Sequence, residues 1–263
     1  MGADRRSPAT ITDIPDIQLN HNKKEIQALS SFNYFMEKYP RRVLWLQHHY
    51  RCNDKIIGFT CREVYGGRIK PVQACSSIKL DKIPSDYRGY YLSSDKPVVF
   101  IDVDGREAGN RNSSKYNIRE AEKVADVVRE LEDMNISMHE IGIITTFRAQ
   151  RQKLLKQLKE NRNRHSLEIN TVDSYQGREK DVIIYSVVGT RDFEFIEDVN
   201  RLNVAFTRAR KKLIVIGNAE AITRVSPNGL LSKYSDYSKE NDGYFTERRI
   251  KEPEPKSLTI RVR

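Results

Sequence analysis

The sequence predicts an α/β domain in which a mostly parallel sheet carries helices on both faces. Two observations favour this class: short apolar runs of the length of buried strands, and amphipathic segments of helical period that alternate with them. The length of 263 residues fits one such domain with extensions. Parallel strands are covered on both faces and are therefore apolar throughout, and the helices between them imply right-handed crossovers.

The first part of the chain is expected to be a lead-in segment, residues 1–40. Residues 1–30 are polar and show no clear period, whereas Phe32–Tyr39 has a helical pattern. A second helix is expected over Asp54–Val64, because the glycine pair Gly66-Gly67 follows it. Residues 71–96 contain two prolines and two serine pairs and are expected to form loops.

The alternation of strands and helices is clearest from residue 98 onward. Val98–Ile101 is a short apolar run that we expect to be a buried strand. The helix that follows the next loop is expected to start after Asn117, which caps it together with Glu120. The later elements are expected to be strands at Ile141–Thr145, Leu167–Thr171, Val182–Val188 and Leu213–Ile216, and helices at Arg148–Lys159 and Val199–Arg208. We therefore expect a globular domain over residues 41–223 and a mobile polar tail over residues 224–263.

The composition favours some classes of function and excludes others. The net charge of +10 favours a polyanionic partner, and between Phe147 and Arg164 there are seven Lys or Arg against one Glu. The three cysteines have no Cys-x-x-Cys spacing, which argues against a zinc ribbon or a disulfide framework and indicates an intracellular compartment, cytoplasm or nucleus. No apolar run reaches about 18 residues, so we expect no membrane span, and we assign no metal-ligating residue.

Polar side chains follow two of the expected strands. Thr145, Thr146 and Arg148 come at the end of one strand, and Thr171 and Ser174 at the end of the next. Ligands of an open parallel sheet bind outside the carboxyl ends of its strands, and hydroxyl groups and helix N-termini are good phosphate ligands. The alternative is that these residues are local caps and turns.

The stretch RLNVAFTRARKKLIVIGN, Arg201–Asn218, places cations directly before an apolar strand. Arg208 would project from the C-terminal end of the preceding helix toward a neighbouring site. The alternative is a surface arginine at a helix C-terminus, which the helix dipole favours.

Five segments together carry a resemblance to a known family. They are HHYRCNDKIIGFTCREVYGGRI, VFIDVDGREA, IGIITTFRAQ, INTVDSYQGREKDVIIYSVV and RLNVAFTRARKKLIVIGN, in that order along the chain. The sequence resembles the second RecA-like domain of superfamily 1 helicases, in the subgroup of the nonsense-mediated-decay helicase, senataxin and the Armitage-type RNA-silencing helicases. The resemblance implies a RecA-like, P-loop-NTPase-type fold, and through its subgroup a place in RNA decay or RNA silencing.

The resemblance also implies roles at matching positions. Arg208 is similar to an arginine finger that reaches the γ-phosphate of ATP, and Arg51 to a second phosphate-contacting arginine. Tyr50, Gly177 and Glu179 match nucleotide neighbours. Gln18 is similar to the residue that ends the motif closing the first domain. The residues expected at the sugar-phosphate backbone of a single strand are Thr145, Thr146, Arg148, Thr171 and Ser174.

No Gly-x-x-x-x-Gly-Lys-[Ser/Thr] motif occurs in the sequence. ATP with Mg²⁺ would therefore need a first RecA-like domain, from the same parent product or another polypeptide, or the site would stay incomplete. The sequence predicts the C-terminal half of an ATP-dependent nucleic-acid helicase, with RNA favoured over DNA by subgroup. The isolated chain is expected to be inactive. The alternative is a non-catalytic single-strand-binding or scaffold module, a degenerate helicase copy.

Overall fold

The computed structural model describes residues 31–39, 44, 46–81, 90–109, 114–159, 164–175 and 177–247. In these ranges the strands are β1 (His48–His49), β2 (Lys70–Pro71), β3 (Val98–Asp102), β4 (Ile141–Thr145), β5 (Glu168–Thr171), β6 (Lys180–Ser186), β7 (Ala209–Gly217) and β8 (Tyr244–Thr246). The α-helices are α2 (Ser31–Lys38), α3 (Asp54–Glu63), α4 (Ile118–Asp133), α5 (Arg148–Lys159), α6 (Val199–Phe206), α7 (Ala219–Val225) and α8 (Leu230–Glu240). Short 3₁₀ helices are η2 (Gln73–Ser77), η4 (Met138–Glu140) and η6 (Asp173–Tyr175).

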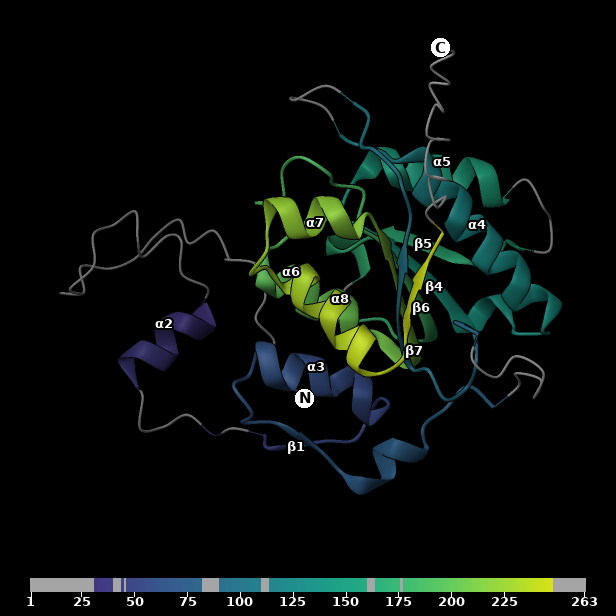
Figure 1. The fold of residues 1–263 in the computed structure, drawn as a ribbon. Coiled ribbons are helices and arrows are strands. Elements are labelled where there is room, and N and C mark those ends of the chain that lie inside the picture. The colour runs from purple at the N-terminus through teal and green to yellow at the C-terminus, as the bar shows by residue number, and fades with distance from the viewer. Residues whose placement is uncertain are drawn as a thin grey trace, which may run out of the picture.

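The main sheet is parallel throughout and lies between two layers of helices (Figure 1). Its strand order is β5-β4-β6-β7-β3-β8, while β1 and β2 form a small separate sheet. Strands β4 and β6 have their amino ends together, with Ile141 opposite Val182. Thr145 at the carboxyl end of β4 lies opposite Thr171 at the carboxyl end of β5. The predicted mostly parallel α/β fold is confirmed.

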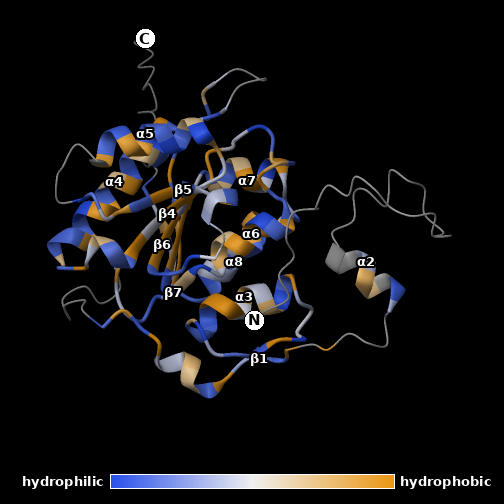
Figure 2. Cartoon of the chain, turned by 180° about the vertical axis from the view of Figure 1, so that it is seen from behind, coloured by the Kyte–Doolittle hydropathy of each residue, from blue (hydrophilic) through white to orange (hydrophobic). Residues whose placement is uncertain are grey.

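Side chains of the strands contribute to two apolar clusters, one on each face of the sheet. Ile183 and Tyr185 face a cluster that includes residues of α3, α6, α7 and α8. Val182 and Ile184 face the cluster under α4 and α5. Figure 2 shows the resulting pattern, with apolar strands inside and polar outer surfaces on the helices. Because helices cover both faces, the strands are apolar along most of their length.

Several predicted elements appear where the periodicity placed them. β4 and α5 match their predicted bounds, and α4 begins after Asn117, whose side chain accepts a hydrogen bond from the Glu120 amide at 3.3 Å. α6, however, ends at Phe206 rather than Arg208. β7 starts at Ala209, four residues before the predicted strand, because its basic first half also pairs with β6.

The prediction of a mobile tail from residue 224 is wrong for residues up to 247. Leu230, Leu231 and Tyr234 of α8 are buried, and the Tyr234 ring packs 5.1 Å from Phe59 and 4.9 Å from Phe206 between centroids. β8 then adds an edge strand to β3. The aromatic packing stabilises a segment whose composition is polar. Residues 248–263 of the predicted tail, and residues 1–30 of the predicted lead-in, lie outside the described residues.

None of the helices in the described part of the chain combines the length and the apolar character that a membrane span requires.

Candidate nucleotide and nucleic-acid sites

Arg51 and Arg208 both contact one short segment at the amino end of β6. Arg51 Nε lies 3.1 Å from Glu179 Oε2, and Arg208 Nη1 donates to the Arg178 carbonyl at 3.4 Å. The backbone reinforces this junction, because the Lys180 amide donates to the Arg208 carbonyl at 3.0 Å. We call Arg51, Glu179 and Arg208 the arginine cluster.

The two arginines differ in how firmly they are held. Arg208 Nε donates to the Val204 carbonyl at 3.0 Å, so the guanidinium also contacts the C-terminal turn of α6, as the helix-end alternative predicted. The Arg51–Glu179 pair is solvent-accessible, with exposed side-chain fractions of 40% and 47%. Such exposed pairs contribute only about 0–1 kcal/mol. A phosphate can therefore compete with Glu179 for Arg51 at little cost.

The turn that carries Tyr50 and Arg51 is closed by side chains. His49 Nε2 accepts a hydrogen bond from the Cys52 amide at 3.1 Å and lies 3.1 Å from Cys52 Sγ, which then donates as a thiol. Burial lowers the pKa of His49 to about 4 and raises the pKa of Cys52 to about 12, so both are neutral near pH 7. The Asn53 amide donates to the Arg210 carbonyl at 2.8 Å, which fixes this turn beside β7. The neutral His49–Cys52 pair therefore holds this turn in place, and the Cys52 thiol is not a thiolate nucleophile.

The remaining predicted nucleotide neighbours are placed as follows. Tyr50 is 70% exposed beside Arg51, which leaves its ring available for stacking. Gly177 has φ +80, a left-handed conformation that favours glycine, two residues before Glu179. Gln18 lies outside the described residues.

Residues 172–175 and 177–179, which we call the crossing segment, lie between the carboxyl end of β5 and the amino end of β6. Tyr175 is buried against the sheet on the face of α3 and α6. Its ring fits over Gly142 of β4, where any Cβ would lie 2.0 Å from the hydroxyl oxygen. The segment thus joins the arginine cluster to the opposite end of the sheet.

The predicted strand-contacting residues gather at the carboxyl ends of β4 and β5. Thr171 Oγ1 donates to Ser174 Oγ at 3.2 Å, and Arg148 is exposed at the first turn of α5. Thr146 Oγ1 is 2.8 Å from the Tyr185 hydroxyl and is partly buried. We call Thr146, Arg148, Thr171 and Ser174 the carboxyl-end cluster.

Thr145 does not belong with this exposed set. Its side chain is fully buried, and its hydroxyl has no hydrogen-bond partner in the described part of the chain. In this conformation the Thr145 side chain cannot touch a bound strand. The sequence placed it at the correct strand end, but the last residue of a buried strand can point inward as well as outward.

Three residues beside the carboxyl-end cluster were not singled out from the sequence. The Phe147 and Phe195 rings are 6.0 Å apart, and the Arg201 guanidinium lies 4.1 Å above the Phe195 ring. Phe195 is 46% exposed. A cation and an exposed aromatic ring next to hydroxyl groups are the components of a single-strand binding surface. Phe195 lies in a polar loop without periodicity, so no sequence signal marked it.

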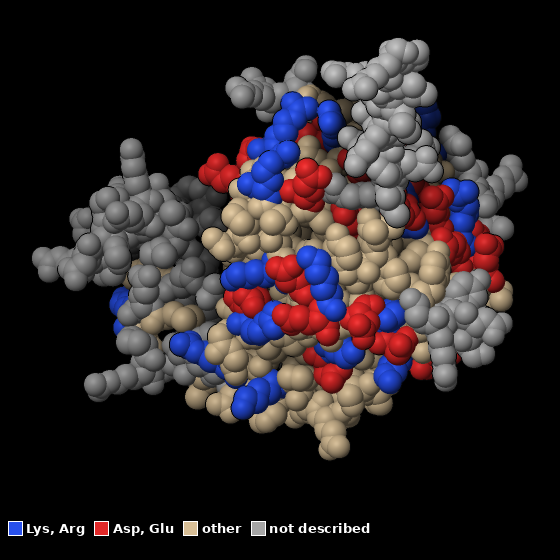
Figure 3. All heavy atoms as spheres, in the orientation of Figure 1, with Lys and Arg blue, Asp and Glu red and all other residues tan. Residues whose placement is uncertain are grey.

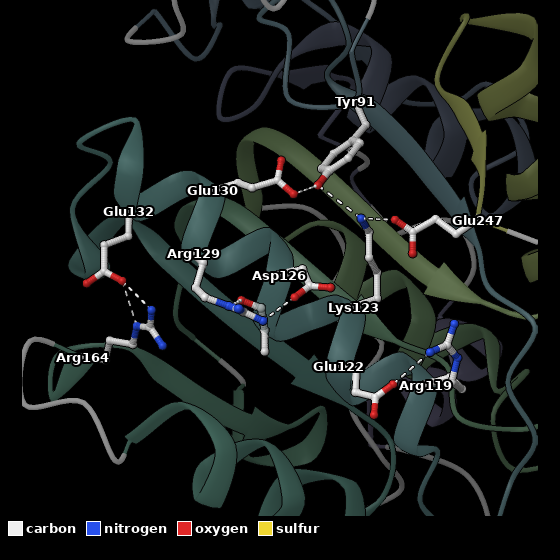
Figure 4. A network of polar contacts seen from close by, with 11 residues as sticks. Tyr91, Arg119, Glu122, Lys123, Asp126, Arg129, Glu130, Glu132, Arg164 and Glu247 are labelled. Atoms are coloured by element: carbon white, nitrogen blue, oxygen red, sulfur yellow. Dashed lines mark hydrogen bonds and ion pairs between the residues drawn. The ribbon is translucent and has the colours of Figure 1, made fainter.

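On other faces of the domain, positively and negatively charged side chains pair with one another. Figure 3 shows cations and anions interspersed over α3 and α8, where Arg62 pairs with Glu240 at 3.2 Å and Lys233 with Glu63 at 2.9 Å. On α4, Arg119 pairs with Glu122 at 3.1 Å (Figure 4). A polyanion gains little from such neutralised surfaces.

The parallel sheet with its two clusters at opposite strand ends defines a RecA-like domain of the helicase type. The model of the family described as "AAA domain" matches residues 27–220, more than half of the chain, and the chain belongs to this family. Its relatives confirm the resemblance to the second RecA-like domain of superfamily 1 helicases, including the nonsense-mediated-decay subgroup.

Three relatives illustrate the range of sequence identity and coverage. The chain is 37% identical over 215 residues to an uncharacterized ATP-dependent helicase of Methanocaldococcus jannaschii, covering 78% of this chain and 31% of that protein. It is 32% identical over 254 residues to the DNA polymerase alpha-associated DNA helicase A of Saccharomyces cerevisiae, covering 91% and 36%. It is 30% identical over 232 residues to the regulator of nonsense transcripts 1 of Dictyostelium discoideum, covering 81% and 17%. The chain thus spans about a third or less of the length of these relatives.

Proposed function

We propose that this chain acts as the C-terminal half of an ATP-dependent nucleic-acid helicase or translocase, supplying the arginine finger and part of the single-strand site. The observation that supports this most directly is the meeting of Arg51 and Arg208 at residues 178–179. Two guanidinium groups beside one segment can face the oxygens of a triphosphate that another domain holds. Family membership supports the same activity.

The chemistry explains why arginines are needed. During hydrolysis a water attacks the γ-phosphorus, the bond to the β–γ bridging oxygen breaks, and negative charge spreads over the γ-oxygens and the departing ADP. An arginine that arrives from a second domain stabilises this charge and contributes on the order of 10³–10⁵ in rate. Mg²⁺ neutralises phosphate charge when bound, and we expect its ligands from a first RecA-like domain. Arg51 would exchange Glu179 for a phosphate oxygen, and Arg208 would act as the finger.

The test is Arg208→Ala in a two-domain protein that contains a first RecA-like domain. Strand-stimulated ATP hydrolysis should fall by about 10³-fold or more while much of the ATP binding remains. Arg208→Lys should not rescue turnover, because an ammonium group cannot make the bidentate hydrogen bonds to two phosphate oxygens that a planar guanidinium makes. Arg210→Ala is the matched control: Arg210 is exposed two positions on and pairs with Asp181 at 3.3 Å. Near-normal turnover in Arg208→Ala would refute the finger assignment.

The carboxyl-end cluster would contact the sugar-phosphate backbone, which gives sequence-tolerant and salt-dependent binding. RNA is the proposed strand by analogy with the nonsense-mediated-decay subgroup, and DNA is the alternative, since the relatives include a protein named for transcripts and one named for DNA. Matched RNA and DNA oligonucleotides decide this, since only RNA offers a 2′-hydroxyl. On this proposal the protein works in the cytoplasm or nucleus.

A second candidate is a non-catalytic strand-binding module. It is favoured by one observation: the carboxyl-end cluster lies entirely within this chain, whereas a nucleotide at the arginine cluster would need a phosphate cradle from another domain. The purified chain should then bind single strands in a salt-sensitive manner. Adding a separately expressed first RecA-like domain separates the two candidates, because restored ATP hydrolysis supports the enzyme half and its absence supports the module.

A further inference from the structure

Two buried carboxylates hold the turn that follows β6, residues 187–191, which we call the post-β6 turn. Glu120 of α4 is fully buried, and its Oε2 accepts hydrogen bonds from Ser186 Oγ at 2.7 Å and from the Val188 amide at 2.8 Å. Glu107 Oε2 accepts from the Thr190 amide at 2.8 Å. Glu120 thus contacts the beginning of the turn, and Glu107 contacts its end.

Each carboxylate is itself held in place. Glu120 Oε1 accepts from Asn117 Nδ2 at 3.0 Å, and Gln150 Nε2 donates to Ser186 Oγ at 3.0 Å, which ties α4, α5 and β6 together. Glu107 Oε1 lies 3.3 Å from Lys115 Nζ. Because a buried carboxyl oxygen or backbone amide that loses its hydrogen-bond partner is costly, these contacts hold the turn in place.

The conformation that they hold is a strained one. Val188 has φ +72, and a β-branched residue in the left-handed region is disfavoured by contacts of its Cβ. The adjacent Gly189 does not relieve this, because the positive φ falls on the valine. Such strain persists only when surrounding contacts over-determine it, and the Val188 amide donates directly to Glu120.

The post-β6 turn leads straight to Phe195. The next residues form a compact turn in which the Ile196 amide donates to the Phe193 carbonyl at 2.9 Å. That turn sets the Phe195 ring 6.0 Å from Phe147, whose chain neighbours are Thr146 and Arg148 of the carboxyl-end cluster. Ile196 also packs over Gly189, where a Cβ would lie 2.2 Å from Ile196 Cδ1, so the position of Phe195 depends on the post-β6 turn.

We propose that Glu107 and Glu120 are positioning residues for strand binding, which fix Phe195 as a base-stacking surface beside the carboxyl-end cluster. The proposal deepens the proposed function and rests on it, since the position of Phe195 matters only if a strand binds there. Loss of one well-placed base stack corresponds to roughly 10-fold weaker binding.

The experiment measures the affinity of the full chain for fluorescein-labelled 12-nucleotide RNA and DNA by anisotropy. We expect Phe195→Ala and Glu120→Gln each to weaken binding about 10-fold, and the double variant to weaken it no further, because both act through one ring. Val188→Gly in the Glu120→Gln background should restore most of the affinity, since glycine adopts a positive φ without support.

The controls separate positioning from general stability. Glu130 is another carboxylate of α4, ten residues along the helix from Glu120, and accepts a hydrogen bond from the Tyr90 hydroxyl at 3.0 Å. Figure 4 shows Glu130 beside Tyr91. Glu130→Gln should lower stability without changing strand affinity. Glu107→Gln supplies an independent variant should Glu120→Gln fail to fold.

The outcomes are distinct. If the wild-type chain binds and Phe195→Ala binds equally well, the positioning proposal is overturned and the proposed function stands. It is also overturned if Glu120→Gln or Glu107→Gln lowers the unfolding temperature but leaves affinity unchanged. If the wild-type chain binds no strand of either kind, the strand-binding part of the proposed function fails, and this proposal fails with it.

Discussion

Gly142 should tolerate no side chain, because the Tyr175 ring of the crossing segment lies directly over it. A Cβ at position 142 would lie 2.0 Å from the Tyr175 hydroxyl oxygen, 2.9 Å from Tyr175 Cζ and 2.9 Å from Ile183 Cδ1. All three separations are shorter than packed atoms allow, and Tyr175 is fully buried and has no open direction in which to swing. Gly142→Ala should therefore cost about 1–3 kcal/mol of unfolding free energy, as overpacked cores do.

Urea unfolding followed by circular dichroism measures this cost, and the thermal midpoint should fall by roughly 2–12 °C. Moving Tyr175 also moves Glu179 four residues on, so the Arg51 contact should be lost. Gly58→Ala in α3 is the matched control: its Cβ would lie 3.0 Å from only one flexible group, the Tyr237 hydroxyl, and alanine favours the helix by about 1 kcal/mol. Stability of Gly142→Ala within about 0.5 kcal/mol of wild type would show that the packing argument is wrong.

Three further changes test buried polar groups, each by urea unfolding. Tyr175→Phe removes a buried hydroxyl that has no partner in the described residues, so stability should stay constant or rise by up to about 1–3 kcal/mol. Lys212→Met should cost about 3 kcal/mol or more, because the buried Lys212 ammonium donates to three carbonyls of residues 91–96, which would be left unpaired; an unchanged midpoint would contradict this. Burial raises the pKa of Glu120 from its ordinary value of 4.5 to about 8. The folded protein then holds a proton that the unfolded chain releases, so stability from this group is complete below about pH 4.5 and is lost as pH rises through 8. Glu120→Gln should remove that slope, and an identical pH profile for variant and wild type would count against it.

Strong periodicity made most of the fold predictable. The bounds of β4 and α5 follow from a short isoleucine-rich stretch and from leucines at helical spacing. α8 could not be found this way, because its sequence LLSKYSDYSKE is polar and only the rings of the core make Tyr234 a buried residue. β8 has three residues, too few for any pattern.

The candidate site was predictable in its members but not in its arrangement. Motif matching singled out Arg51, Glu179 and Arg208, and the structure brings them to one segment. How they are joined to the carboxyl-end cluster depends on the packing of the crossing segment, in which the Tyr175 ring lies over Gly142. A long-range steric fit of this kind leaves no local signal. For the same reason the inward direction of Thr145 could not be anticipated.

The crossing segment has a mechanical consequence. Its described residues include a candidate strand contact, Ser174, and a candidate nucleotide contact, Glu179, and the Tyr175 ring between them packs over Gly142 of the sheet. Because Tyr175 is buried against this sheet, the same sheet positions both contacts. If a nucleotide held by a neighbouring domain pulls on Glu179 or its partner Arg51, we expect the sheet and the strand contact to move with it as one body.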